Sequence, residues 1–403
     1  MTVHFIHGMA AAWINARTFY PFSLAWLRLH AGRCALLGFA LSFSFGIHAE
    51  KPMAADPIIF GQSAPLSGPA AQLGVDFNFG ANLYFYEVNK EGGVHGRKIE
   101  LRIFDDKYEP ERTIENTQRL IQEDKVFALM GYVGSATSQA VLPLVNESGI
   151  PFLAAFTGSE TLRAPFNPNV FNMRAGYFDE TGAIVRHLST LGMKRIAVFH
   201  ENDANGKAAL EGVERAVKSM GLSLVASGSV ERNGIDVGKA VRDISAAQPQ
   251  AVVMMAAYSG SVAFIREMQK LDSPPWLWNT SFVGSQVLAR ELEERGRGIQ
   301  ISQVVPFPWN ANNALVRGYQ KVLTEVKGEP GFGSLEGYIA AKVVVEALRR
   351  AGSNPSRASF VKAMESLQPY DMGGYTIRFS PSNHNGSTYV DLTMITTGQK
   401  FVR

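Results

Sequence analysis

Cysteine is almost absent from this sequence: the one cysteine in 403 residues is Cys34, within a leading stretch that has no acidic residue. Beyond residue 49 the chain has no thiol, which excludes disulfides and thiolate chemistry from that part. Histidine is scarce as well. The histidines after residue 49 are His95, His187, His200 and His384. None of them has a second histidine three or four positions away, so the spacing typical of zinc ligands is missing and no metal site is expected.

An excess of charge of one sign is also missing. The formal net charge is +3, and it comes from three arginines in residues 1–49, which contain no lysine and no acid. The remaining residues hold 36 basic and 36 acidic side chains, since the chain has 39 and 36 in total. A neutral chain offers no electrostatic reason to bind nucleic acid or an anionic membrane. Hydrophobic residues make up 46% of the sequence, which is enough for two sizeable cores.

The one long apolar run lies near the start of the chain. Arg28 and Arg33 precede fourteen apolar or small residues, 34–47. A helix that crosses the hydrocarbon needs about 20 residues, so this run predicts a signal peptide over residues 1–49, with cleavage after Ala49 or Ala55. The alternative is a membrane anchor that is never cut. Arg33 directly before Cys34 does not suit a lipid-modified cysteine, so we expect no lipoprotein.

From residue 57 onward, the hydrophobic pattern alternates between strand and helix. The pattern predicts strands at 58–64, 98–105, 126–130 and 151–155, and helices at 74–89, 109–124 and 137–148. A second set has strands at 195–200, 223–230 and 251–256, and helices at 206–220, 237–246 and 262–270. Repeated units of this kind require parallel sheets covered by helices. The sequence therefore predicts an α/β protein with two doubly wound parallel-sheet lobes.

After residue 305 the pattern changes. Helical spacing returns at 314–326 and 335–351, and strand-like alternation runs from 375 to 401. Ligands of open α/β sheets bind beyond the carboxyl ends of the strands. The loops after Met130, Ala155, His200 and Ala256 are therefore the expected places for a binding site.

Two of these loops carry groups suited to a small ligand. Residues 131–138 follow a buried strand, open a helix and include two glycines and the hydroxyls of Ser135 and Thr137. Free amides and hydroxyls at a helix start favour a carboxylate or a phosphate. The next strand ends at Ala155, Phe156 and Thr157, where a carbonyl and a hydroxyl suit an ammonium group. The alternatives are an ordinary helix cap and an ordinary turn.

Signatures of enzymes are missing. Residues 331–337 differ by one position from the glycine fingerprint of dinucleotide-binding proteins, and no strand is predicted before them. Gly206 and Lys207 lack the upstream glycine of a phosphate-binding loop. No serine, histidine and acid are singled out as a catalytic triad. We therefore expect a protein without enzymatic activity and without a cofactor.

Several motifs follow one another at the spacing of a known family. They are residues 58–68, 89–98, 105–106, 131–139, 149–158 and 200–206. In these motifs the sequence resembles the leucine/isoleucine/valine-binding proteins, and the resemblance covers about residues 57–400. It implies the type I periplasmic-binding fold, in which two lobes are joined by a three-segment hinge. It further implies one lobe at 56–174 plus 305–387, and the other at 175–304 plus 388–403.

The resemblance also implies a set of ligand-binding residues. They are Ser135, Ala155, Phe156, Thr157, Asn205, Tyr258 and Ser281. By likeness to the family, Ser135 binds the ligand carboxylate, and the Ala155 carbonyl and Thr157 hydroxyl receive an α-ammonium group. Tyr258 is expected to reach across from the second lobe. Its alternative role is simply to pack at the end of a strand.

Three positions depart from the family pattern. Leu73 stands where a tyrosine is usual, Asn205 where an aromatic is usual, and Ser281 where an acid completes the ammonium site. Losing that acid removes a charge-assisted hydrogen bond that contributes about 1.5–3 kcal/mol in other systems. Either another acid serves, or the ligand is not a simple α-amino acid. The candidate acids are Glu336, Asp203 and Asp179. The specificity for leucine, isoleucine or valine therefore does not transfer.

The expected function is that of a periplasmic substrate-binding protein of an ABC-type importer. We expect a monomer that closes its two lobes around an amino-acid-like or carboxylate ligand and is then recognised by a permease in the inner membrane. The alternative is a ligand-sensing input module of a signalling system on the same fold. A sensor of that kind usually carries a membrane exit and an output domain, and no such pattern appears before Arg403.

Overall fold

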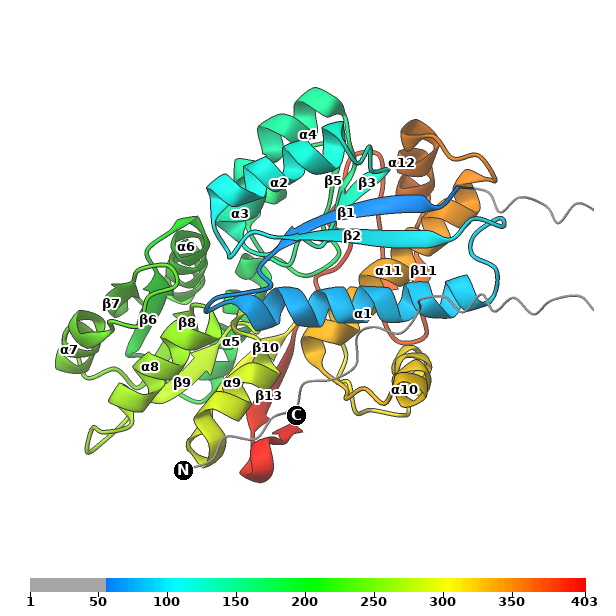
Figure 1. Cartoon of the computed structure of the whole chain (residues 1–403). Coiled ribbons are helices and arrows are strands. Elements are labelled where there is room, and N and C mark those ends of the chain that lie inside the picture. Colours follow the sequence, from blue (N-terminus) through cyan, green and yellow to red (C-terminus); the bar gives the residue numbers. More distant parts are fainter. Residues whose placement is uncertain (1–55) are drawn as a thin grey trace, which may run out of the picture. The chain divides into compact units, whose positions relative to one another are not determined.

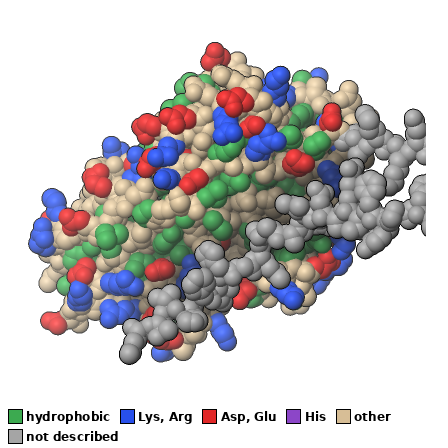
Figure 2. All heavy atoms as spheres, in the orientation of Figure 1, with side chains coloured by type: hydrophobic (Ala, Val, Ile, Leu, Met, Phe, Trp, Pro, Cys, Tyr) green, Lys and Arg blue, Asp and Glu red, His purple; other side chains and the backbone are tan. Residues whose placement is uncertain are grey.

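The structure is a computed structural model that describes residues 56–403. The predicted signal peptide and Cys34 lie outside the described residues. Residues 53–403 form one compact unit. Within the described part of the chain, no helix is both long and apolar enough to cross a membrane. Lysine, arginine, aspartate and glutamate side chains are interspersed over the face shown in Figure 2, with no patch of a single sign.

The first sheet has five parallel strands in the order β2-β1-β3-β4-β5. The strands are β1 (Ile58–Ala64), β2 (Ile99–Asp105), β3 (Ala128–Met130), β4 (Phe152–Leu153) and β5 (Val170–Phe171). The helices that follow them are α1 (Ala71–Lys90), α2 (Pro110–Gln122), α3 (Ser135–Ala140) and α4 (Leu142–Ser148), with a 3₁₀ turn at Glu160–Leu162. Figure 1 shows α2, α3 and α4 on one face of this sheet and α1 on the other.

Three later helices return to the first lobe. They are α10 (Ala314–Val326), α11 (Phe332–Ala351) and α12 (Arg357–Glu365). In Figure 1, α11 runs beside α1. The two backbones approach so closely that a Cβ atom added to Gly80 would lie 1.7 Å from the Ser334 carbonyl oxygen. α12 is attached by Arg357, whose guanidinium donates hydrogen bonds to the carbonyl oxygens of Val126 and Phe127.

The second sheet has seven strands in the order β14-β13-β10-β9-β8-β6-β7. Its parallel strands are β6 (Ile196–Glu201), β7 (Leu224–Val230), β8 (Ala251–Met255), β9 (Trp276–Asn279) and β10 (Gln300–Gln303). β13 (Asp391–Ile395) and β14 (Phe401–Val402) are antiparallel additions at one edge. The helices are α5 (Tyr177–Thr190), α6 (Ala204–Ser219), α7 (Gly238–Ala246), α8 (Tyr258–Met268) and α9 (Ser285–Leu292). The predicted α/β class with two lobes built on parallel sheets is confirmed.

The chain passes between the two sheets three times: after β5, after β10 and before β13. A short hairpin, β11 (Tyr370–Asp371) with β12 (Thr376–Ile377), precedes the third passage. Its residue Tyr375 is buried, and the hydroxyl donates to the carbonyl oxygens of Met173 at 3.0 Å and Val304 at 3.1 Å. The side chain of Tyr375, near the third passage, therefore links the backbones of the first and second passages by hydrogen bonds.

Some expected elements differ from the structure. The single helix expected at 137–148 is wrong, because α3 ends at Ala140 and a new helix, α4, begins at Leu142. Pro143 in the first turn of α4 has no backbone N–H to donate, which explains the break. The helix expected from residue 262 begins earlier, at Tyr258. The alternation expected from 375 to 401 contains only the short strands β12, β13 and β14.

Candidate functional site

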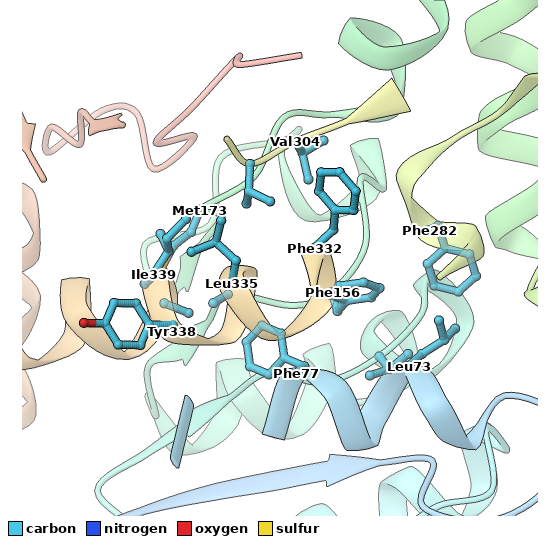
Figure 3. Packing of buried hydrophobic residues seen from close by; sticks show 14 of the residues in the cluster. Leu73, Phe77, Phe156, Met173, Phe282, Val304, Phe332, Leu335, Tyr338 and Ile339 are labelled. Carbon is cyan, nitrogen blue, oxygen red and sulfur yellow. The ribbon is translucent and has the colours of Figure 1, made fainter. Parts of the chain in front are cut away.

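Aromatic side chains from the two lobes meet where the carboxyl ends of the two sheets face each other. Phe282 follows β9 in the second lobe, and its ring centroid lies 6.2 Å from those of Phe156 and Tyr108 in the first lobe. Figure 3 shows Phe282 facing Phe156 and Leu73. Phe156 in turn packs against Phe77, with 6.1 Å between the ring centroids. These contacts bury apolar surface from both lobes, so the lobes are in a closed arrangement.

A small cavity remains between the lobes, with a volume of about 10 Å³. The first lobe contributes Leu73, Asp76, Phe156, Phe332 and Glu336 to its wall, and the second contributes Ser281, Ser285 and Gln286. Such a volume holds about one water molecule. Any ligand as large as an amino acid therefore needs the lobes to separate before it enters.

The structure brings Ser135 and Thr157 together. Ser135 is the first residue of α3, Thr157 follows β4, and their hydroxyl oxygens are 2.8 Å apart. The Thr157 hydroxyl also lies 3.0 Å from the hydroxyl of Tyr177, whose pKa burial raises to about 12. All three side chains are buried. This cluster of neutral hydroxyls can donate hydrogen bonds to an anionic group.

Backbone geometry places this cluster. Gly134 precedes α3 with φ at +95°, and an added Cβ would lie 2.3 Å from the Tyr108 ring, so glycine is required there. α3 has only six residues, so its contribution to anion binding is limited to its first amides. The Ala155 carbonyl accepts the amide N–H of Thr157 at 2.8 Å, and the Phe156 side chain lines the cavity.

Tyr258 and Asn205 lie at the starts of two helices in the second lobe. Tyr258 is the first residue of α8 and is half-buried. Burial raises the pKa of its phenol, and the backbone of Gln72, a residue of α1 in the first lobe, opposes that change. Asn205 is the second residue of α6. Tyr258 therefore lies near α1 of the opposite lobe.

Ser281 belongs to a buried polar network that the sequence did not reveal. Its amide N–H donates to a Glu180 oxygen at 2.8 Å, and its hydroxyl accepts from the guanidinium of Arg174. The Ser302 hydroxyl donates to the same Glu180 oxygen at 2.7 Å. Arg174 lies 3.4 Å from both Glu180 and Glu336, and its guanidinium is 4.8 Å from the centre of the Phe156 ring. Arg174 therefore joins charged groups of the two lobes.

The candidate acids have different environments. Asp203 caps α6 by accepting the amide N–H of Gly206 at 3.0 Å, and Asp179 accepts that of Gly176 at the start of α5. Both are structural caps, which is the usual role of an aspartate at such a position. Glu336 is different because it lines the cavity. Burial raises its pKa to about 7, although Arg174 opposes that change.

Glu201 is a second buried acid that the sequence reasoning missed. It is the last residue of β6, and it accepts the amide N–H of Ala257 at 3.1 Å and the hydroxyl of Tyr108 at 3.4 Å. Burial, and then repulsion from Asp203, raises its pKa to about 8. The sequence signal that could have identified Glu201 is its position at the carboxyl end of a predicted strand, next to a loop where a binding site was expected. Within residues 56–403, no cluster of acidic, histidine or cysteine side chains is arranged to hold a metal ion.

Comparisons with known proteins find extensive similarity. Residues 57–400 match the family described as periplasmic binding protein. The chain is 26% identical over 374 residues to the Leu/Ile/Val-binding protein homolog 7 of Brucella suis biovar 1 (strain 1330), covering 86% of this chain and 90% of that one.

Solved structures resemble the fold along almost its whole length. A possible leucine/isoleucine/valine-binding protein from Rhodopirellula baltica SH 1 superimposes with a TM-score of 0.83 and 32% identity, covering 88% of this chain and 98% of that one. A substrate-binding periplasmic protein from Ralstonia solanacearum gives a TM-score of 0.81 and 32% identity, with 86% and 99% covered.

Proposed function

Because the chain belongs to the periplasmic binding proteins of the leucine/isoleucine/valine-binding type, we propose that it captures a small carboxylate or amino-acid-like ligand for an ABC-type importer. The ligand binds between the lobes and leaves chemically unchanged. A permease in the inner membrane then recognises the closed form. The protein works in the periplasm after removal of a signal peptide. The names of the relatives, which refer to amino-acid binding, support this ligand class.

The hydroxyl pair of Ser135 and Thr157 is the observation that carries the proposal. The two side chains come from different loops of the first lobe, and their oxygens are 2.8 Å apart. Both are fully buried, and Phe156, the chain neighbour of Thr157, lines the cavity. In the closed arrangement the two hydroxyls are hydrogen-bonded to each other, and a carboxylate can accept hydrogen bonds from several such donors at once. We assign the ligand carboxylate to this pair and to the amides at the start of α3, which gives Thr157 a different role from the ammonium contact that the resemblance implies.

The remaining predicted residues complete the proposed site. Ala155 and Phe156 flank the hydroxyl pair, and Asn205, Tyr258 and Ser281 belong to the second lobe. We place the lobe boundaries at 174/175, 304/305 and 387/388, the three passages between the sheets. Ligand binds one lobe, contacts the other and thereby favours closure, because only the closed form makes both sets of contacts.

The test is a thermal-shift panel on purified protein that has been unfolded and refolded to remove carried ligand. The panel holds amino acids, aromatic and aliphatic carboxylic acids, and the corresponding amides. A ligand at 100 times its dissociation constant adds about 2.7 kcal/mol, which raises the melting midpoint by several degrees. Mass spectrometry of the recovered ligand checks that it is unchanged.

Variants connect any positive result to the site. We expect Ser135→Ala and Thr157→Ala each to weaken carboxylate binding about tenfold, since each removes one hydrogen bond to a charged group. Ser148→Ala is the matched control, because the Ser148 hydroxyl bonds only to carbonyl oxygens of its own helix. A panel in which no carboxylate raises the midpoint would contradict the proposed ligand class.

A further inference from the structure

The carboxylate of Glu336 is unusual among the buried acids of the cleft. Glu336 lies in the first turns of α11, is 9% exposed and lines the cavity. Its carboxylate lies 3.4 Å from the guanidinium of Arg174. Among the residues that the structure describes, no group donates it a hydrogen bond. A buried carboxylate normally accepts several hydrogen bonds. Glu336, which lines the cavity, can therefore still accept hydrogen bonds from a group in the cavity.

Arg174 does not fully compensate this charge. The same guanidinium also lies 3.4 Å from Glu180, so it is shared by two carboxylates, and Arg163 favours the charged form of Glu336 less than Arg174 does. Glu180 is already satisfied, because it accepts hydrogen bonds from the Ser281 amide and the Ser302 hydroxyl. Asp76 adds another acid to the cavity wall, and Gln72 donates one hydrogen bond to it. The wall of the cavity therefore has more anionic than cationic groups.

A second polar group of the wall also lacks a partner. The amide nitrogen of Gln286 is buried and has no hydrogen bond, although the oxygen of the same side chain accepts the amide N–H of Phe332 at 3.2 Å. Gln286 comes from α9 in the second lobe and faces the same cavity as Glu336. The cavity thus offers an uncompensated acceptor from one lobe and an unused donor from the other. That combination suits a ligand with a donating group and an accepting group.

We propose that Glu336 discriminates ligands that carry a cationic amino group from ligands that do not. In the closed protein, the amino group hydrogen-bonds the Glu336 carboxylate and balances the negative charge that Arg174 leaves uncompensated. Arg174 is a positioning residue, because it holds Glu336 at the cavity wall while bonding to Ser281 of the other lobe. This inference rests on the proposed function, since it takes the cavity as part of the ligand site.

Electrostatics support this assignment. Burial raises the pKa of Glu336 to about 7, so the carboxylate is only partly ionised near neutral pH in the closed protein. A cation at hydrogen-bond distance favours the ionised form and lowers the pKa again. A ligand of the same shape that lacks the amino group leaves the carboxylate buried without compensation. It therefore binds more weakly even where its apolar contacts are the same.

The experiment uses matched pairs of probes that differ by one amino group. The pairs are L-leucine with 4-methylpentanoate, L-phenylalanine with 3-phenylpropanoate, and L-glutamate with pentanedioate. Affinities for the refolded protein are measured by titration calorimetry and compared with those for Glu336→Gln. The side chain keeps its size in this variant, and Arg174 retains Glu180 as a partner. For at least one pair, we expect the amino acid to bind the unchanged protein ten- to hundredfold more tightly than its partner, and Glu336→Gln to remove most of that ratio.

Glu346→Gln is the matched control. Glu346 is on the same helix and is also paired with an arginine, at 2.8 Å from Arg350, but it does not line the cavity. Its substitution should leave the ratio unchanged. Because the readout is a ratio of two affinities, a general loss of stability in Glu336→Gln does not imitate the expected result.

Two outcomes would overturn the inference, and only the second of them would also overturn the proposed ligand class. If both members of every pair that binds the unchanged protein bind it equally well, or if the ratio survives in Glu336→Gln, Glu336 does not discriminate amino groups. The carboxylate site at Ser135 and Thr157 then still stands. If no probe of any pair binds the unchanged protein, the inference and the proposed ligand class are both wrong.

Discussion

The hydroxyl of Tyr108 in the first lobe lies 3.4 Å from the carboxylate of Glu201 in the second. Glu201 is 2% exposed, and burial raises its pKa to about 8. The usual pKa of a glutamate is 4.5. The folded, closed protein therefore takes up a proton at Glu201 that the unfolded chain does not hold between about pH 5 and pH 8. A contact between the lobes is thus linked to protonation.

This linkage predicts how stability depends on pH. The raised pKa means that the contribution of Glu201 is fully present at low pH and is lost as the pH rises towards 8. We expect the free energy of unfolding to fall by about 3 kcal/mol for this group over that range. Thermal melts from pH 5 to pH 8.5 would show a midpoint that falls by several degrees.

The substitution Glu201→Gln isolates the effect. It should flatten part of the pH dependence, while Asp106 and Glu336 retain theirs, because burial raises their pKa values to about 6 and 7. The control is Glu211→Gln on the exposed side of α6, which should leave the pH profile unchanged. A Glu201→Gln profile parallel to that of the unchanged protein would contradict the assignment.

Glycine at the contact of α1 with α11 predicts a large loss of stability on substitution. A Cβ atom at Gly80 would lie 1.7 Å from the Ser334 carbonyl oxygen, so Gly80→Ala must push the two helices apart. We expect the free energy of unfolding to fall by about 3 kcal/mol in urea denaturation. Gly318→Ala on α10 is the control. Its added Cβ would be 3.5 Å from the nearest atom, and helix propensity should make it neutral or slightly stabilising.

The buried hydroxyl of Tyr375 predicts a loss of stability that comes from missing hydrogen bonds rather than from a steric clash. Tyr375→Phe leaves the carbonyl oxygens of Met173 and Val304 without this donor, at the first two passages between the lobes. Leaving buried acceptors unpaired costs about 1–3 kcal/mol, measurable by chemical denaturation. Tyr86→Phe should cost almost nothing, because Tyr86 is 46% exposed. Equal effects of the two changes would show that the Tyr375 hydrogen bonds do not contribute.

Opening of the lobes can be measured directly. Beyond residue 49 the sequence has no cysteine, so one cysteine at Glu115 and one at Lys239 give a pair of defined labels on exposed positions of different lobes. Pulsed electron resonance should show a long and broad distance distribution without ligand, and a shorter, narrow one with a ligand that raises the melting midpoint. A distribution that a bound ligand does not change would contradict closure. Labels at Glu115 and Glu147, both exposed in the first lobe, are the control for motion within a lobe.

The alternation of strands and helices was predictable because each element buries one face or both. β1 was predicted at 58–64, and α10 at 314–326, with the bounds found in the structure. Both sheets consist mainly of parallel strands with continuous apolar runs, which short polar loops separate. Such runs depend on local sequence, and sequence reasoning detects them.

The elements around the passages were harder to predict. β9 has four residues, follows two prolines and is succeeded by a 3₁₀ turn at Ser281–Val283, so no periodicity develops there. α5 carries the fully buried Glu180 and also buries Ile184, Val185 and Leu188. A charged residue in a sequence is normally read as solvated, because a buried charge is stable only with partners elsewhere in the chain. Two partners of Glu180, Ser281 and Ser302, are 101 and 122 residues away.

Among the binding residues, too, those in loops after predicted strands were predictable, and those defined by contacts between the lobes were not. The loop carrying Ser135 and the turn carrying Thr157 were found because each follows a predicted strand, and the structure places them in contact. Arg174 and Glu201 were missed. Each is recognised as part of the cleft only from contacts with the other lobe, which for Arg174 are those with Glu180 and Ser281, and those contacts depend on closure rather than on local sequence.

The packing of α11 along α1 has a consequence for the order of assembly. The two helices are neighbours in space, but about 250 residues of chain separate them, including the entire parallel part of the second sheet. Residues 58–171 therefore cannot complete their core while the nascent chain is shorter than about 350 residues. The second sheet likewise waits for β13 and β14 at the end of the chain. Neither lobe can complete its core early, so each stays incompletely packed until synthesis of the chain is nearly complete.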